Sequence, residues 1–248
     1  MADWNDTSRN AQRMGSVPRA GGDVAGRVSY DEGLRKHMLS IYNYMTSGIL
    51  LTGIVALLAF TSGTAAAIFT GGILRWIVAL SPLAIVFAMS LGANRFSTGT
   101  LQAMFWAFSV LMGLSLSSVF LVYTGGSIAT TFFATAAAFA GLSLYGYTTK
   151  RSLSGLGSFL IMGVIGLIVA SVINLFLQSP AFYYAISFIG VLIFAGLTAY
   201  DTQRLKNEYE YLRGTEFAGK AVILGALSLY LDFINMFQFL LSFLGSRE

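Results

Sequence analysis

The sequence has no cysteine, one histidine (His37) and only 10% charged residues. Without cysteine, disulfides, thiolate metal sites and cysteine nucleophiles are excluded. One histidine is too few for zinc sites built on His and Cys, and it leaves little supply for Ser-His-Asp catalysis. These shortages exclude several large classes of enzyme and metal site before any motif is considered.

Apolar residues, in contrast, are abundant. Of 248 residues, 56% are hydrophobic, and the mean hydropathy is +0.71. This is more apolar material than one soluble core of this size holds, so the sequence predicts an integral membrane protein whose main partner is the lipid bilayer. The net charge of +4 does not indicate a nucleic-acid partner, because the basic residues are scattered rather than gathered on one face.

The N-terminal segment, residues 1–37, differs from the rest. It holds basic and acidic residues with Gly, Asn and Ser between them and few large apolar side chains. Such a segment cannot bury enough surface to offset its chain entropy, so we predict a disordered cytoplasmic tail, with a helix beginning between Tyr30 and His37. The first apolar run begins near Met38, too late and too long for a signal peptide.

Seven apolar runs follow, each near the length of a membrane-spanning helix. They cover about residues 38–60, 73–93, 101–123, 127–147, 157–177, 181–200 and 221–244. The connections are short, and Ser97 or Thr98 is suited to cap the third helix. We therefore predict an all-α integral membrane protein, with residues 38–248 forming a seven-helix transmembrane bundle.

The basic residues also predict the orientation. All 15 Lys and Arg residues except Arg75 and Arg247 lie in the N-terminal segment or in the connections after the second, fourth and sixth runs. By the positive-inside rule, that side of the membrane is cytoplasmic. We therefore predict a cytoplasmic N-terminus and a C-terminus on the other side of the cytoplasmic membrane.

The last run contains Asp232 deep inside an apolar stretch, LSLYLDFINMF at residues 227–237. A charge there is costly and usually lies on an ion or proton path, although a purely structural carboxyl is the alternative. A helical projection places small and polar residues on one side of the helix: Gly225, Ser228, Asp232, Asn235 and Ser242. Lipid cannot hydrogen-bond such a stripe, so we predict that the C-terminal helix is central in the bundle.

Asp201 is the second acidic candidate, in GLTAYDTQRLK at residues 196–206. Its position near the predicted end of the sixth helix leaves an alternative, that it only ends a spanning helix at the water interface. Asp232 lies about 16 Å of helical rise beyond Ala221. The two aspartates therefore meet only if the sixth helix reaches deeper than predicted or the seventh begins later.

If they meet, their chemistry follows from their charge. Two carboxylates in a poorly hydrated site do not both stay charged easily, so one is expected to hold a proton that a divalent cation can displace. Oxygen ligands suit Ca²⁺, with carbonyls, Asn235 or water completing the six to eight ligands that it takes. Arg95, after the second run, is the candidate counter-charge; the alternative is that it anchors the helix at the headgroups.

The stretches around the two aspartates resemble the bacterial branch of the Bax inhibitor-1 family. GYTTKRSLSGLGSFLIMG at residues 146–163 adds to this resemblance, which covers about residues 38–244. It implies a seven-helix bundle with a central last helix, and a Ca²⁺ leak that responds to pH through an aspartate pair matching Asp201 and Asp232. Arg95 matches an arginine that pairs with the helix-six aspartate in one state. Asn94-Arg95 differs from the more basic cluster of some family members. The connection at residues 207–220 is longer than in family members with a shorter loop there.

Together these observations predict a pH-sensitive calcium leak channel of the inner membrane, with Asp201 and Asp232 as proton sensor and cation site, no enzymatic activity, and no cofactor beyond the transported Ca²⁺. One alternative is a regulatory or scaffold protein that acts through an unidentified membrane protein partner. The other is an intramembrane aspartyl protease. Such proteases resemble Gly-x-Gly-Asp at the second aspartate, whereas residues 229–231 before Asp232 are Leu, Tyr and Leu.

Overall fold

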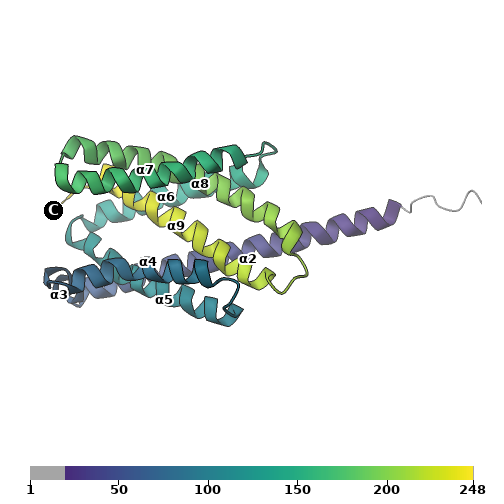
Figure 1. Ribbon diagram of the computed structural model, residues 1–248, viewed down its shortest axis with the longest axis horizontal. Helices are drawn as coiled ribbons and strands as arrows, with labels where there is room; N and C mark the ends of the chain where they lie inside the picture. The colour runs from purple at the N-terminus through teal and green to yellow at the C-terminus, as the bar shows by residue number, and fades with distance from the viewer. Residues whose placement is uncertain (1–19, 248) are drawn as a thin grey trace, which may run out of the picture. The chain divides into compact units, whose positions relative to one another are not determined.

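The computed structural model describes residues 20–247, which are helical apart from short connections and an isolated bridge between Tyr123 and Arg247 (Figure 1). In chain order the elements are α2 (Ala20–Thr61), α3 (Thr64–Thr70), α4 (Leu74–Gly92), α5 (Thr98–Leu116), the 3₁₀ helix η1 (Ser117–Leu121), α6 (Gly125–Thr148), α7 (Ser154–Leu177), α8 (Pro180–Leu212) and α9 (Ala218–Leu244).

The chain divides into two units at His37. In the first unit, residues 20–37 form the beginning of α2, so the helix begins earlier than the predicted start between Tyr30 and His37. This part of the predicted disordered tail is therefore helical. The tail prediction for residues 1–19 lies outside the described residues.

Within residues 20–247, seven helices are long and apolar enough to cross a membrane. They are Tyr30–Thr61, Leu74–Gly92, Thr98–Leu121, Gly125–Thr148, Ser154–Leu177, Pro180–Leu212 and Ala218–Leu244. The prediction of an all-α, seven-helix membrane protein is confirmed. Ser97 caps the third of these helices, since its side chain accepts a hydrogen bond from the Thr100 amide.

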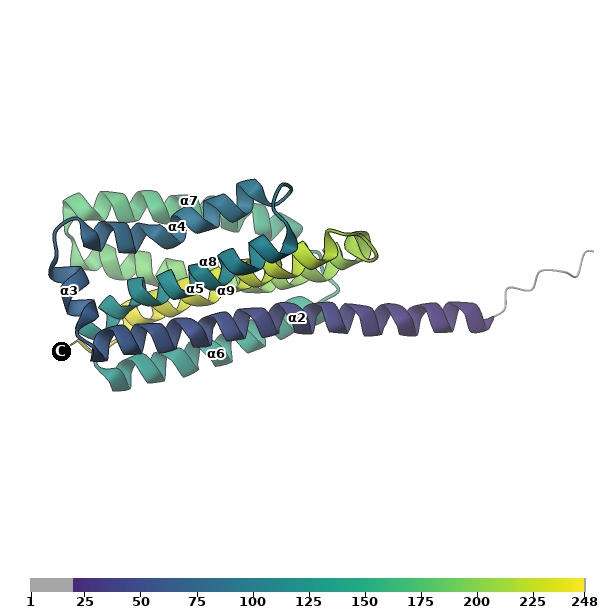
Figure 2. The ribbon, with the colours of Figure 1, turned by 90° about the horizontal axis from the view of Figure 1, so that it is seen from below.

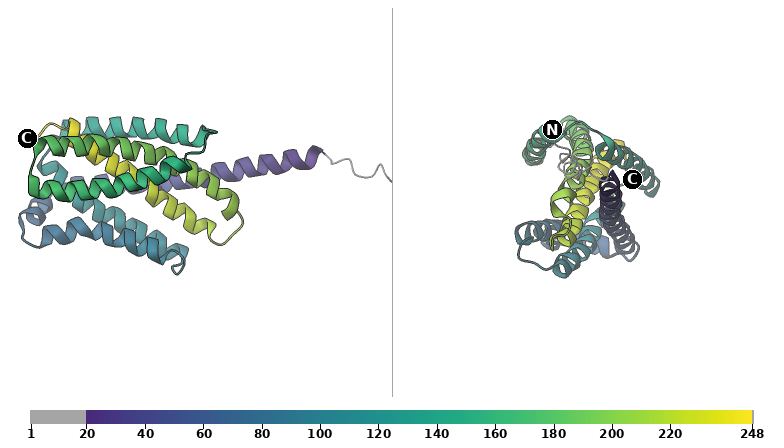
Figure 3. Two further views of the ribbon diagram at one scale, coloured as in Figure 1. Left: turned by 45° about the horizontal axis from the view of Figure 1, so that its top comes forward. Right: turned by 90° about the vertical axis from the view of Figure 1, so that its right-hand side faces the viewer.

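The last helix, α9, runs through the middle of the bundle. It packs against α8, α6 and α5, and it crosses between the group of α6, α7 and α8 and the group of α4 and α5 (Figures 1 and 3). In its apolar window 61% of the residues are buried, against 11% for α4 and for α7. The prediction of a central C-terminal helix is therefore confirmed.

The sixth span differs from the prediction. It was predicted to end near residue 200, but α8 continues to Leu212. The added turns are polar, so hydropathy predicted an earlier end of the helix. Packing and ion pairs nevertheless stabilise these turns. Leu205 is buried, and Arg204 pairs with both Asp201 and Glu208 along the helix.

Close helix crossings hold α8 in place. A Cβ added to Gly146 of α6 would lie 2.2 Å from the Ala199 carbonyl oxygen of α8, so only glycine allows this approach. At the cytoplasmic end predicted from the charges, Gln203 accepts a hydrogen bond from the Leu153 amide at 2.8 Å and donates one to the Arg151 carbonyl at 2.8 Å. These contacts fix the rotation of α8 at residues 199–203, which sets the direction of Asp201.

Candidate functional site

Asp201 lies on the side of α8 that faces α9. Its side chain is buried, with 5% of the residue exposed. One carboxylate oxygen lies 3.3 Å from the Arg204 guanidinium, and the other accepts a hydrogen bond from the Ser228 hydroxyl on α9. A carboxylate that is out of water is stabilised by donors of this kind, so Asp201 has a ready partner for its charge.

Asp232 lies one turn beyond Ser228 on α9 and is 4% exposed. Among the described residues, no donor lies within hydrogen-bonding distance of its buried Oδ2. Its carboxyl group lies within reach of the Asp201 carboxyl. Two carboxyl groups can share a hydrogen bond only when one of them carries a proton.

The long α8 explains why the two aspartates meet. Asp201 lies eleven residues before the end of α8 at Leu212, about 16 Å of rise from the turn into α9. Ser228 lies ten residues after Ala218, about 15 Å along α9, and Asp232 lies about 6 Å deeper. The sixth helix therefore does not end near Asp201, as its predicted bounds had it. The added length of α8 brings the two carboxyl groups to neighbouring levels.

Arg204 is the positive charge of this site. Its Nη2 lies 3.0 Å from the Ser228 hydroxyl as well as 3.3 Å from Asp201, and its Nε lies 3.6 Å from Glu208. The Arg204 side chain is 37% exposed, whereas that of Asp201 is 8% exposed. A single guanidinium thus pairs with the buried Asp201 carboxylate, and within residues 20–247 it forms no ion pair with Asp232.

Arg95 lies elsewhere in this structure. It is exposed in the turn between α4 and α5, where its backbone amide donates to the Gly92 carbonyl. Within residues 20–247, neither Asp201 nor Asp232 forms an ion pair with it. The interpretation of Arg95 as a gate partner in another state stays a prediction.

Sequence reasoning did not identify Arg204 and Ser228 as partners of the pair. The signals were present: Arg204 follows Asp201 at the helical spacing of three residues, and Ser228 lies on the predicted polar stripe. Asn235, predicted as a cation ligand, donates its side-chain amide to the Leu231 carbonyl of its own helix at 2.8 Å.

The cluster offers few ligands to a metal ion. Over the described residues, no group of three or more His, Cys, Asp and Glu side chains could hold a metal. Asp201, Asp232 and Ser228 together supply fewer than the six to eight oxygens that Ca²⁺ takes, so an ion at this site would keep much of its water.

The comparisons with known proteins add a family. The family model described as "Inhibitor of apoptosis-promoting Bax1" matches residues 34–248. The chain belongs to this Bax inhibitor family. The match includes all seven spanning helices from Met38 onward and both aspartates, so the chain is a multi-pass membrane protein of that family.

Individual relatives are similar over nearly their whole length. An uncharacterized protein of Caulobacter vibrioides is 48% identical, covering 98% of this chain and 99% of its own. The Escherichia coli K12 protein named inner membrane protein YbhL is 45% identical, covering 95% and 100%. A Rickettsia prowazekii protein is 44% identical, covering 89% and 93%.

Proposed function

We propose that this Bax inhibitor family protein is a pH-sensitive calcium leak channel of the inner membrane, with its N-terminus in the cytoplasm. The relative named inner membrane protein YbhL supports the location, and the distribution of Lys and Arg supports the orientation. The observation that carries the proposal is that the carboxyl groups of Asp201 and Asp232 are both buried and lie near each other. They come from α8 and α9, the two helices that pack most extensively against each other.

A cation would pass along the stripe of small and polar residues on α9. Contacts near both ends place this stripe against α8: Ser228 bonds to Arg204, and Ser242 accepts a hydrogen bond from the Tyr183 hydroxyl at 2.9 Å. Polar groups inside a membrane bundle are expensive and mark ion pathways. The α8–α9 interface, with the carboxyl pair part-way along it, is therefore the path we assign to the ion.

In the present conformation aromatic packing blocks this path on the far side of the carboxyl pair. The Phe239 ring of α9 stacks on Phe194 of α8, with ring centroids 5.8 Å apart, and it lies against Gly190. A hydrated ion needs this packing to open. We therefore describe the conformation as closed, with α9 as the gate.

The protonation state of the pair would control the gate. With one proton shared, the two carboxyl groups attract each other and hold α8 to α9. When the proton leaves, two like charges face each other in a poorly hydrated site, and a cation or a second guanidinium becomes the preferred partner. This change of partners biases an equilibrium between a closed and an open bundle, and Arg95 is the candidate guanidinium for the open one.

The experiment is Ca²⁺ flux into liposomes that contain the purified protein, from about pH 5 to about pH 8. The native chain is compared with Asp201→Asn and Asp232→Asn, and Glu216→Gln serves as the matched control because this carboxylate is exposed in the α8–α9 connection. We expect a pH-dependent flux whose pH profile is changed by both aspartate variants and not by the control. No flux above that of empty liposomes at any pH, from folded protein, would refute the proposal.

Two further experiments separate the alternatives. Deleting residues 1–30 removes most of the N-terminal segment, so a regulator acting through that segment would lose its effect, whereas a channel would keep its flux. Exchanging Asp201 or Asp232 for Glu tests proteolysis, because a cation site tolerates the longer carboxylate better than a catalytic dyad that shares a proton does.

A further inference from the structure

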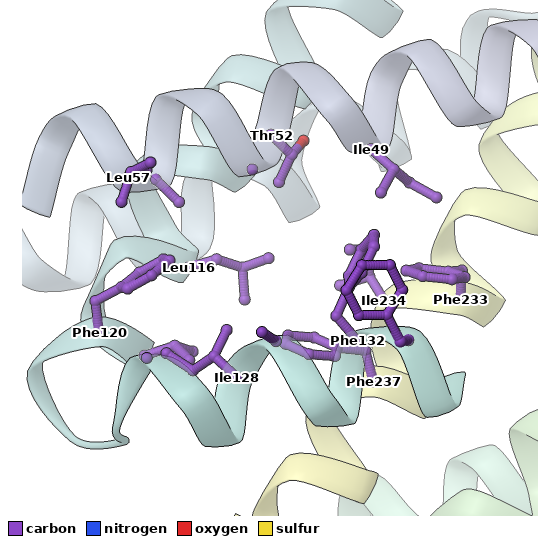
Figure 4. Close-up of a pocket in the computed structure, with 16 residues that line it drawn as sticks. Ile49, Thr52, Leu57, Leu116, Phe120, Ile128, Phe132, Phe233, Ile234 and Phe237 are labelled. Atoms are coloured by element: carbon purple, nitrogen blue, oxygen red, sulfur yellow. The ribbon is translucent and has the colours of Figure 1, made fainter. Parts of the chain in front are cut away.

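A groove opens between α2 and α6, with α9 as its floor (Figure 4). In Figure 2, α6 lies beneath the part of α2 after Met38. It has a volume of about 330 Å³. All of its walls belong to the part of α2 after Met38, to η1 and the end of α5, to α6 and to α9. Among its lining residues are Ile49, Leu57, Phe120, Ile128, Phe132 and Phe237.

The chemistry of the groove is almost purely hydrocarbon. Its one side-chain hydroxyl belongs to Thr52, and this group is already engaged. It donates to the Ser109 carbonyl at 2.8 Å and shares a hydrogen bond of 2.6 Å with the Tyr230 hydroxyl. A polar ligand would therefore lose its hydrogen bonds to water without replacement, which leaves an apolar occupant.

The depth of the groove matches one leaflet of a bilayer. One end lies at Phe120 and Gly125, where one spanning helix ends and the next begins. The other end lies at Phe133 and Phe233, near the middle of α9. From Gly125 to Phe133 the rise along α6 is about 12 Å, close to half of a hydrocarbon core of about 30 Å.

The rim is open to the lipid side, since Gly53, Leu57, Ala129 and Phe133 are exposed. We propose that the groove binds one acyl chain of a phospholipid from the leaflet on the side where α9 ends. This site does not depend on the calcium proposal.

The test fills the groove from within. No atom lies within 4 Å of a Cβ added to Gly53, so Gly53→Phe places a ring in the groove without a backbone clash. Ala129 lines the opposite wall, on α6, so Ala129→Phe is the second filling variant if the first does not fold. The matched control is Gly166→Phe, because Gly166 also lies in a helix interior with open space around it but outside the groove.

The probe is a phosphatidylglycerol with a photoactivatable diazirine in the middle of one acyl chain, mixed into vesicles of phosphatidylethanolamine and phosphatidylglycerol. After illumination, labelled residues are mapped by mass spectrometry. We expect labelling concentrated on Phe132 and Phe237 in the native chain, above that of the lipid-facing Phe159 on α7. Both filled variants should lose most of this labelling, and Gly166→Phe should keep it.

Three results would overturn the proposal. In the native chain, labelling spread evenly over lipid-facing residues means that the groove holds no chain, whether or not the variants fold. If Phe132 and Phe237 are labelled equally in a folded Gly53→Phe or Ala129→Phe variant, the acyl chain reaches them without entering the groove. Links between two copies of the chain through these residues would assign the groove to a second copy.

Discussion

Replacing Ser228 by alanine tests the site at its centre. The Ser228 hydroxyl donates to Asp201 and accepts from the Arg204 guanidinium at 3.0 Å, so it joins the carboxylate and its counter-charge across the α8–α9 interface. Alanine removes both hydrogen bonds and adds no new polar group. Asp201 then keeps its ion pair with Arg204 at 3.3 Å but loses the donor of its other oxygen.

The loss of stability in Ser228→Ala depends on which of the two partners, Asp201 or Arg204, cannot replace the lost hydrogen bond with one to water. Hydrogen bonds to charged groups contribute about 1.5–3 kcal/mol, whereas neutral side-chain bonds inside membranes average about 0.6 kcal/mol. Arg204 is 37% exposed and can turn to water, but Asp201 is buried and cannot. We therefore expect Ser228→Ala to lower the free energy of unfolding by about 1.5–3 kcal/mol, nearly all of it from the Asp201 side.

The assay is reversible unfolding by SDS in mixed lipid and detergent micelles, followed by circular dichroism. The matched control is Ser187→Ala on α8, since Ser187 is a buried serine whose hydroxyl donates to the Tyr183 carbonyl of its own helix. Its loss should be about 0.6 kcal/mol. In an Asp201→Asn background, the effect of Ser228→Ala should fall toward the same value. If it stays as large as in the native chain, the reasoning about Asp201 is wrong.

Two other substitutions test the gate and the crossing of α6 and α8. Phe239→Ala should raise the basal Ca²⁺ flux in liposomes at every pH, because its ring fills the α8–α9 interface, while Phe243→Ala, on an exposed part of α9, should not; equal fluxes would contradict the assigned path. Gly146→Val should lower stability by more than the roughly 1–3 kcal/mol of ordinary overpacking, because its Cβ meets the Ala199 backbone rather than a movable side chain. Gly141→Val, on the same helix with open space around it, should be tolerated, and a similar loss in both would point to helix propensity instead of the crossing.

Much of the candidate site was predictable, because an acidic residue inside an apolar run can be recognised from its immediate sequence neighbours. Asp232 interrupts an apolar run, and its neighbours at helical spacing are small or polar, so its side had to face protein. The same argument placed α9 in the centre. For Asp201 the local signal was ambiguous, because polar residues that continue a helix cannot be told by hydropathy from polar residues that follow its end.

The partners of the aspartates required the fold. Arg204 was near Asp201 in sequence, but its link to Ser228 depends on the level at which α8 and α9 meet, which is set by the turn between Leu212 and Ala218. Arg95 was the candidate counter-charge from sequence, with a headgroup anchor as the alternative, and in this structure it lies in the α4–α5 turn. Sequence spacing along one helix says nothing about which residue of another helix lies opposite.

The sequence by itself determined the class of the protein: seven apolar runs long enough to span a bilayer, no thiol chemistry, and an acidic residue in the last run. These follow from composition and length, which the membrane constrains directly because each spanning segment must satisfy its own backbone in lipid. Only the tertiary structure decided the depth of Asp201, the guanidinium that balances it, and the groove beside α2 and α6. Those features arise from the register and crossing of helices distant in sequence, which depend on side-chain packing between them.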